Sequence, residues 1–111
     1  MTPRVVFVDV DDTMLRSAGP KQIPMSETVR LVKELHEHGV VLYLWSSGGA
    51  DYARESARKL GVEMCFVGFL PKPHGLIDDV DLKDWKIRQF HPTEVVSVTA
   101  DEFLERLDSR E

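Results

Sequence analysis

The sequence predicts an α/β fold with a mostly parallel sheet of about five strands and helices on both faces. Short apolar runs alternate along the chain with segments of helical periodicity, and most of these runs are continuously apolar. Continuous apolar character is typical of strands that are buried on both sides of a parallel sheet. A chain of 111 residues holds one hydrophobic core, so we expect a single domain over residues 1–111.

Five strands and three helices are expected. The strands are predicted at 5–8, 40–45, 63–67, 76–77 and 95–98. The first helix is predicted to be capped by Ser26 and to end at Gly39, and the second to cover about 50–60. Thr99 and Glu102 form a capping box that opens a terminal helix, while residues 80–94 permit either a short helix or a strand.

Composition and charge exclude several classes of protein. A net charge of −5 gives no bulk attraction to nucleic acid or to an anionic membrane. No apolar run approaches the length of a bilayer span, and the N-terminus lacks the pattern of a signal peptide. The single cysteine, Cys65, lies in an apolar stretch and is expected to be a core residue in a reducing compartment. We therefore expect a cytoplasmic protein.

The first strand ends in a cluster of carboxylates. Asp9, Asp11 and Asp12 fall within four positions and are followed by Thr13. Such a cluster is electrostatically unfavourable unless a cation is bound or a proton is shared, so it indicates a function. The function that we infer is phosphoryl transfer with a divalent metal.

Further polar residues follow the later strands. Ser46 and Ser47 come after the second, Lys72 after the third, and Asp78 and Asp79 after the fourth. Because ligands bind beyond the carboxyl ends of parallel strands, all of these side chains are expected at one edge of the sheet.

The chemistry of these groups fits a phosphate ester. Mg²⁺ bound by Asp9 and by one of the two later acids would neutralise the charge of the phosphate. The Ser46 hydroxyl and the Lys72 ammonium would bind its non-bridging oxygens. One carboxylate can then attack phosphorus, and a second acid can protonate the leaving group and later activate water.

The order of these motifs resembles that of the haloacid dehalogenase superfamily over nearly the whole chain. The resemblance rests on an apolar strand followed by Asp-x-Asp-x-Thr (residues 9–13), a strand ending in Ser46, Lys72 between two prolines, and the acidic pair Asp78 and Asp79. It implies a Rossmann-like domain in which Asp9 is the nucleophile and a metal ligand.

The resemblance also implies roles for the other residues. Asp11 would be the general acid/base and offer its backbone carbonyl to Mg²⁺, and Ser46 and Lys72 would bind the phosphoryl group. Asp78 and Asp79 would complete the metal site, and which of them contacts the metal directly stays open. The remaining candidates for phosphate or substrate binding are Asp12, Thr13, Ser47, Gly48 and His74.

The function expected from these residues is Mg²⁺-dependent hydrolysis of a phosphomonoester through an aspartyl phosphate. Asp11 favours an oxygen leaving group, since a halide leaves without protonation. A phosphotransferase or mutase, and a catalytically silent binding module of the same fold, are the alternatives. A phosphoacceptor receiver domain is disfavoured because Lys72 precedes the second acidic pair.

The connections between the predicted elements are too short for a cap domain. Residues 12–26 leave room only for a hairpin, and residues 68–72 leave room for no insertion. An open site implies either a large phosphorylated substrate or a neighbouring subunit of a homo-oligomer that acts as the lid. The acidic charge does not indicate nucleic acid, and the sequence does not identify the substrate.

Overall fold

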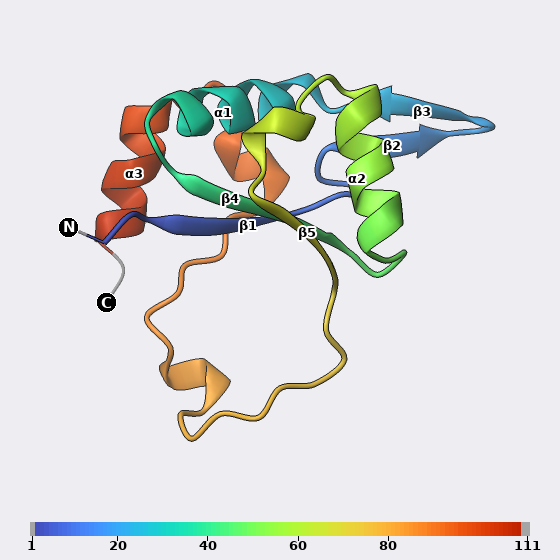
Figure 1. The fold of residues 1–111 in the computed structure, drawn as a ribbon. Coiled ribbons are helices and arrows are strands. Elements are labelled where there is room, and N and C mark those ends of the chain that lie inside the picture. Colours follow the sequence, from blue (N-terminus) through green and yellow to red (C-terminus); the bar gives the residue numbers. More distant parts are fainter. Residues whose placement is uncertain (1, 110–111) are drawn as a thin grey trace.

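Three parallel strands form the main sheet, in the order β1–β4–β5 (Figure 1). The computed structural model describes residues 2–109, and in that part of the chain the sheet consists of β1 (Val5–Asp9), β4 (Val41–Ser46) and β5 (Gly68–Pro71). The α/β class is as predicted, but the parallel sheet is smaller than the five strands expected. Residues 1 and 110–111 of the predicted domain lie outside the described residues.

The register of the sheet aligns the carboxyl ends of its strands. Asp9 at the end of β1 lies opposite Trp45, and Ser46 at the end of β4 lies opposite Pro71. Both pairings are parallel, so the residues that follow the three strands emerge at the same edge.

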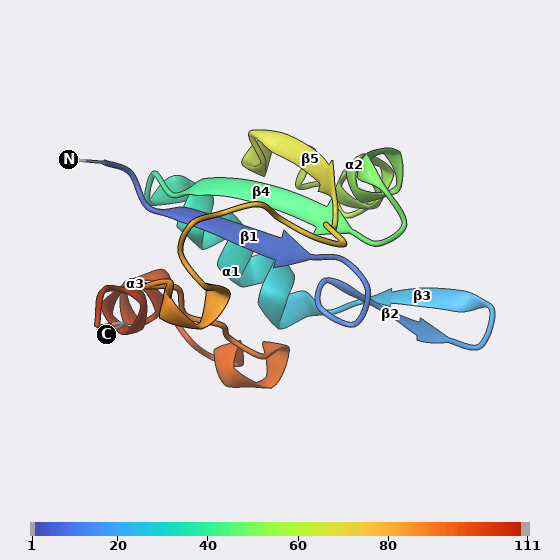
Figure 2. The same ribbon diagram turned by 90° about the horizontal axis from the view of Figure 1, so that it is seen from below.

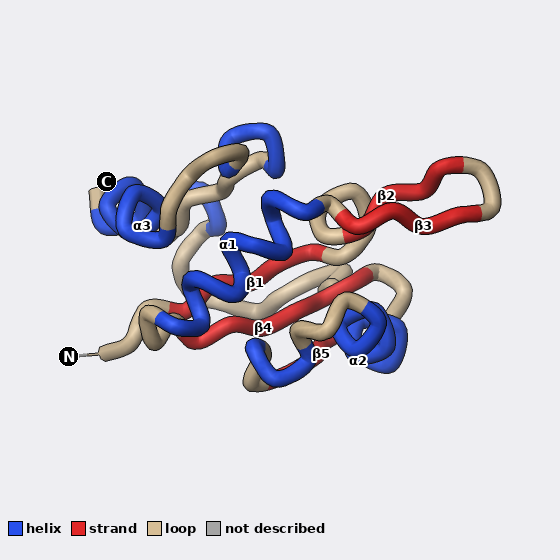
Figure 3. The backbone as a smooth tube through the Cα atoms, turned by 90° about the horizontal axis from the view of Figure 1, so that it is seen from above, coloured by secondary structure: helices blue, strands red, loops and turns tan. Residues whose placement is uncertain are grey.

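Helices cover one face of this sheet. In Figures 1 and 3, α1 (Ser26–Glu37) and α2 (Ala50–Lys59) lie on the same side of the strands, and α3 (Ala100–Asp108) lies beside α1. The side chains of Leu42 and Leu44 are fully buried in the core on this side. The prediction of helices on both faces is wrong, because on the other face Val5 is 51% and Phe7 42% exposed.

Two predicted strands are absent from the described residues, and a third is displaced. Residues 76–77 are irregular, and Ile77 is fully exposed. Residues 95–98 start at the last residue of the 3₁₀ helix Pro92–Val95 and do not pair with a strand. The side chains of Val95 and Val98 are buried in the hydrophobic core. The strand predicted at 63–67 forms later as β5, and residues 63–65 are a 3₁₀ helix.

The segment between β5 and α3 contains only short 3₁₀ helices in its described residues. The first part of the segment, with the turn at Leu82–Asp84, runs past the uncovered face of the sheet (Figures 1 and 2). Its last part, with the turn at Pro92–Val95, packs against α1 on the face that the helices cover. Two short helical turns interrupt it, at Leu82–Asp84 and Pro92–Val95. The region at 80–94, which the sequence left open, is therefore neither a regular α-helix nor a strand.

The connection after β1 folds into the expected hairpin. Strands β2 (Leu15–Ala18) and β3 (Lys21–Pro24) pair antiparallel, and Gly19 has a φ of +62° in the turn. The buried Met14 and Leu15 anchor the base of the hairpin in the core, so its tip projects away from the sheet (Figure 1).

The three predicted helices are confirmed, with one correction at a helix end. The capping box of α3 forms between Thr99 and Glu102. Helix α1 has Met25 at its N-cap without a side-chain hydrogen bond, so the predicted cap by Ser26 is wrong. Cys65 is buried as predicted, and burial raises the pKa of its thiol.

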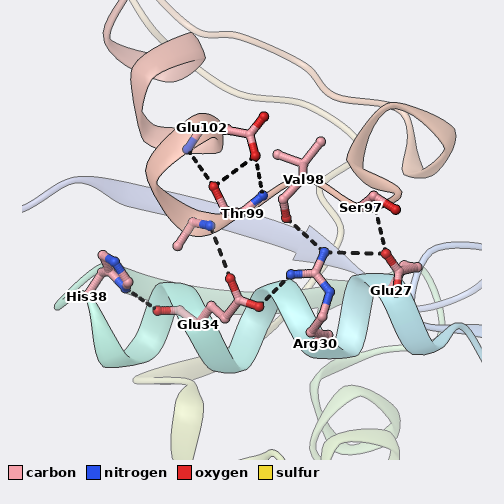
Figure 4. A network of polar contacts seen from close by, with 9 residues as sticks. Glu27, Arg30, Glu34, His38, Ser97, Val98, Thr99 and Glu102 are labelled. Carbon is pink, nitrogen blue, oxygen red and sulfur yellow. Dashed lines mark hydrogen bonds and ion pairs between the residues drawn. The ribbon is translucent and has the colours of Figure 1, made fainter.

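A network of polar contacts ties the segment before α3 to helix α1 (Figure 4). The guanidinium of Arg30 pairs with Glu34 and donates to the Val98 carbonyl at 2.8 Å. The backbone N–H of Ser97 donates to Glu27 at 2.6 Å. These contacts satisfy backbone groups that lie outside regular structure, so they help to fix a segment that belongs to no sheet.

Among the described residues, no helix is long and apolar enough to cross a membrane.

Candidate active site

The carboxyl ends of β1, β4 and β5 bring three predicted site residues together. The Lys72 ammonium lies 3.9 Å from a carboxylate oxygen of Asp9, and the Lys72 backbone N–H donates to the Ser46 carbonyl at 2.9 Å. Side-chain exposure is 31% for Asp9 and 47% for Lys72, so both charges are accessible to a ligand. We call this arrangement the strand-end site.

The turn that follows β1 presents its acids to solvent. Val10 is fully buried, and its carbonyl accepts from the backbone N–H groups of Thr13, Met14 and Leu15. Asp12 has a φ of +58°, the left-handed conformation that Asp tolerates better than most residues. Thr13 is half-buried in this turn. The turn therefore fixes the backbone of the predicted acid/base loop before any ligand binds.

Asp11 has a partner that the sequence did not reveal. The Tyr52 hydroxyl donates to Asp11 Oδ1 at 2.7 Å, although the two residues are 41 positions apart. The hydrogen bond to Asp11, and then burial, raise the pKa of Tyr52. In the sequence, helical spacing places Tyr52 among the residues of α2 that pack against the core. This spacing does not indicate a contact with Asp11.

The turn after β4 leads directly into helix α2. Ser46 is only 1% exposed, and its hydroxyl oxygen accepts from the Gly48 N–H at 3.0 Å. Gly49 is the N-cap of α2 with a φ of +105°, a conformation that favours glycine, and no side chain caps the helix. Ser47 and Gly48 are exposed beside this helix N-terminus. An uncapped N-terminus offers backbone N–H donors and a positive dipole end to an anion.

Asp78 and Asp79 do not directly follow a strand of the sheet. Both are exposed in the loop after β5, where Asp78 accepts from the Val80 N–H at 2.8 Å, and His74 is exposed in the same loop. Among residues 2–109, no three His, Cys, Asp or Glu side chains lie close enough to hold a metal ion together. The side chains of Asp9, Asp11, Asp78 and Asp79 therefore do not form such a cluster, and the strand that was to carry the last two does not form.

A surface hollow lies at the opposite edge of the sheet. It is open to solvent, has a volume of about 630 Å³ and is lined by Arg4, His38 and Asp101 among others. The ion pair of Arg4 with Asp108, at 2.7 Å, is part of this lining. Arg4 precedes the N-terminal end of β1, whereas the polar groups gather at the other end of the strand. This hollow is separate from the strand-end site.

Fold and site together define an α/β protein with carboxylates, a lysine and a helix N-terminus at the carboxyl edge of a parallel sheet. Residues 1–91 match the model of a family described as "Protein of unknown function (DUF705)", and the chain belongs to this family. The assignment to the haloacid dehalogenase superfamily is therefore wrong, since the family that matches is a different one.

A viral protein shares part of the sequence. The chain is 36% identical over 64 residues to the "Uncharacterized 38.0 kDa protein in P143-LEF5 intergenic region" of Autographa californica nuclear polyhedrosis virus. The aligned part covers 58% of this chain and 20% of the viral protein, so the chain spans about a fifth of that relative. No solved structure matches the chain.

Proposed function

We propose that the protein is a phosphomonoester hydrolase that depends on Mg²⁺ and forms an aspartyl phosphate at Asp9. The proposal rests on one observation: Asp9, Lys72 and the turn of residues 46–49 lie together at the carboxyl edge of the parallel sheet. The charged groups of Asp9 and Lys72 are 3.9 Å apart. Such an edge is where ligands bind in open α/β sheets, including Rossmann-like ones.

The donors at this edge fit a magnesium ion that is held jointly with a phosphate. Mg²⁺ in phosphoryl-transfer sites takes one or two carboxylates, retains several waters and shares the substrate phosphate. Asp9 would supply one carboxylate and Asp11 its backbone carbonyl, while Asp78 and Asp79 have no part in the proposal. The bound ion would neutralise the repulsion between the phosphate and Asp9.

The reaction has two steps. A carboxylate oxygen of Asp9 attacks phosphorus, the bond from phosphorus to the ester oxygen breaks, and that oxygen takes a proton from Asp11. Water then attacks the aspartyl phosphate and gives a proton to Asp11, which releases inorganic phosphate and restores both acids. Lys72 and the backbone N–H groups at the start of α2 stabilise the charge on the transferred group.

Ser46 has a more limited role in this proposal than the sequence predicts. Its hydroxyl oxygen already accepts from Gly48, and the residue is buried, which supports a role in shaping the turn. The exposed Ser47 is better placed to donate to a phosphate oxygen. The accessible edge supports a phosphorylated macromolecule as the substrate, or a second copy of the chain as the lid.

Turnover of p-nitrophenyl phosphate tests the proposal directly. We expect hydrolysis with Mg²⁺, none after metal removal with EDTA, and a loss of at least about 10³-fold in Asp9→Asn, which cannot form the acyl phosphate. Asp84→Asn is the matched control, because Asp84 is an exposed carboxylate of the short 3₁₀ helix Leu82–Asp84 and pairs with the neighbouring Lys83. Undiminished activity in EDTA, or in Asp9→Asn, would remove the mechanism.

A binding measurement does not depend on turnover. With Mg²⁺ present, BeF₃⁻ should raise the melting temperature of the wild type by mass action, and Asp9→Asn should abolish the rise. Small phosphates, phosphopeptides and oligonucleotides phosphorylated at the 3′ or 5′ end then distinguish the substrate classes.

A catalytically silent phosphate-binding module is the second candidate. The placement of Asp78 and Asp79 in an exposed loop favours it, because fewer acids are then available to hold a metal. Stabilisation by BeF₃⁻ or phosphate without hydrolysis of any substrate in the panel would select this alternative.

A further inference from the structure

Tyr52 joins three elements that are far apart in the sequence. It lies in the first turn of α2, donates to Asp11 in the turn after β1, and accepts from the side-chain amide of Gln22 in β3 at 3.3 Å. Figure 1 shows helix α2 beside the β2–β3 hairpin, which agrees with this contact. The hairpin is therefore connected to the candidate site through one phenol.

The two hydrogen bonds fix the direction of the Tyr52 hydroxyl. Because the phenol oxygen accepts from Gln22, its own proton is directed to Asp11. The ring is also held in place, since it packs against the hydrophobic core and a Cβ atom on Gly48 would lie 2.9 Å from it. The Tyr52 hydroxyl is therefore oriented toward Asp11, and it binds only the Oδ1 atom of that carboxylate.

We infer that Tyr52 is a positioning residue for Asp11, and that Gln22 sets the orientation of Tyr52. This inference rests on the proposed role of Asp11 as the general acid/base. The Tyr52 hydroxyl binds Oδ1 and leaves Oδ2 to exchange a proton with the leaving oxygen and then with water. Precise placement of an acid matters most where the leaving group is poor.

The test compares two aryl phosphates at saturating concentration. Tyr52→Phe keeps the ring and removes the hydroxyl, so kcat for phenyl phosphate should fall about tenfold. For p-nitrophenyl phosphate, which needs less help from an acid, kcat should fall less than about threefold, with KM unchanged for both substrates. Gln22→Leu should act in the same direction with a smaller loss.

Tyr43→Phe is the matched control. Tyr43 lies in β4 with its ring against Phe7, 5.0 Å between centroids, and no hydrogen bond of its hydroxyl is found within residues 2–109. Its rates with both substrates should equal those of the wild type. An equal loss for the two substrates in Tyr52→Phe, or no loss for either, would overturn the inference.

A stability cycle separates this inference from the proposed function. Tyr52→Phe should lower the melting temperature by about 2–4 °C in the wild type and by less than about 1 °C in an Asp11→Ala background. An equal fall in both backgrounds would refute the contact whether or not the protein is active. If the wild type hydrolyses neither substrate while the cycle shows coupling, the proposed function fails and the Tyr52–Asp11 contact stands.

Discussion

Removal of Arg30 should destabilise the protein far more than removal of a typical surface arginine. In Arg30→Ala the carbonyl of Val98 loses a hydrogen bond of 2.8 Å from a charged donor, and Val98 is only 6% exposed. Hydrogen bonds to charged groups contribute about 1.5–3 kcal/mol. The Arg30 side chain is 32% exposed, so water replaces part of that contribution, and the ion pairs with Glu27 and Glu34 add little.

We therefore expect a loss of about 1–2 kcal/mol in the free energy of unfolding. For a domain of this size that corresponds to a fall of about 4–8 °C in melting temperature. Thermal and urea unfolding followed by circular dichroism measure both quantities.

Arg58→Ala is the matched control. Arg58 also pairs with a glutamate on its own helix, Glu55 at 3.0 Å, but its side chain is 60% exposed. Its removal should change stability by less than about 0.5 kcal/mol. If the two variants lost the same stability, the contact with the Val98 carbonyl would contribute nothing, and the reasoning would be refuted.

Three further predictions follow from the geometry. Gly48→Ala should reduce phenyl phosphate hydrolysis, because the new methyl group would lie 2.9 Å from the Tyr52 ring and displace it. Gly75→Ala is the control and should match the wild type, because the space around Gly75 is open. Equal rates of hydrolysis in the two variants would contradict this prediction. Lys72→Ala should weaken the thermal stabilisation by Mg²⁺ and BeF₃⁻, and an undiminished shift would exclude Lys72 from the site. The hydrogen bond from Arg30 holds the pKa of Glu34 below its ordinary 4.5, so as the pH falls the unfolded chain protonates Glu34 before the folded protein does. The contribution of Glu34 to stability is therefore present above pH 4.5 and lost as the pH falls below it. In urea unfolding, Glu34→Gln should lose less stability on acidification than the wild type.

The local sequence determined the helices and the hairpin. Apolar spacing and terminal signals lie within a few residues of one another, so α1, α2 and α3 could be predicted without tertiary information. The capping box of Thr99 and Glu102 is of the same kind, since its partners are three positions apart. The hairpin followed from the short, turn-rich connection after β1.

The sequence also determined that Asp9, Ser46 and Lys72 meet at one edge. Asp9 and Ser46 end two strands of the parallel sheet and Lys72 follows the third, and parallel pairing aligns the ends of such strands. For Asp78 the same reasoning failed, since it depended on a strand of two residues. So short a strand offers few hydrogen bonds to offset the entropy of ordering it, and residues 76–77 form a loop.

Only the tertiary structure decided the size of the sheet and the partner of Asp11. The side chains of Val95 and Val98 gain the same kind of stabilisation, removal of apolar area from water, in a buried loop as in a buried strand. Burial by itself is non-directional, so an apolar run does not specify what will cover it. The contact between Tyr52 and Asp11 likewise joins residues 41 positions apart, and it exists because α2 and the turn after β1 pack at the same edge of the sheet. A pattern along the chain does not contain that packing.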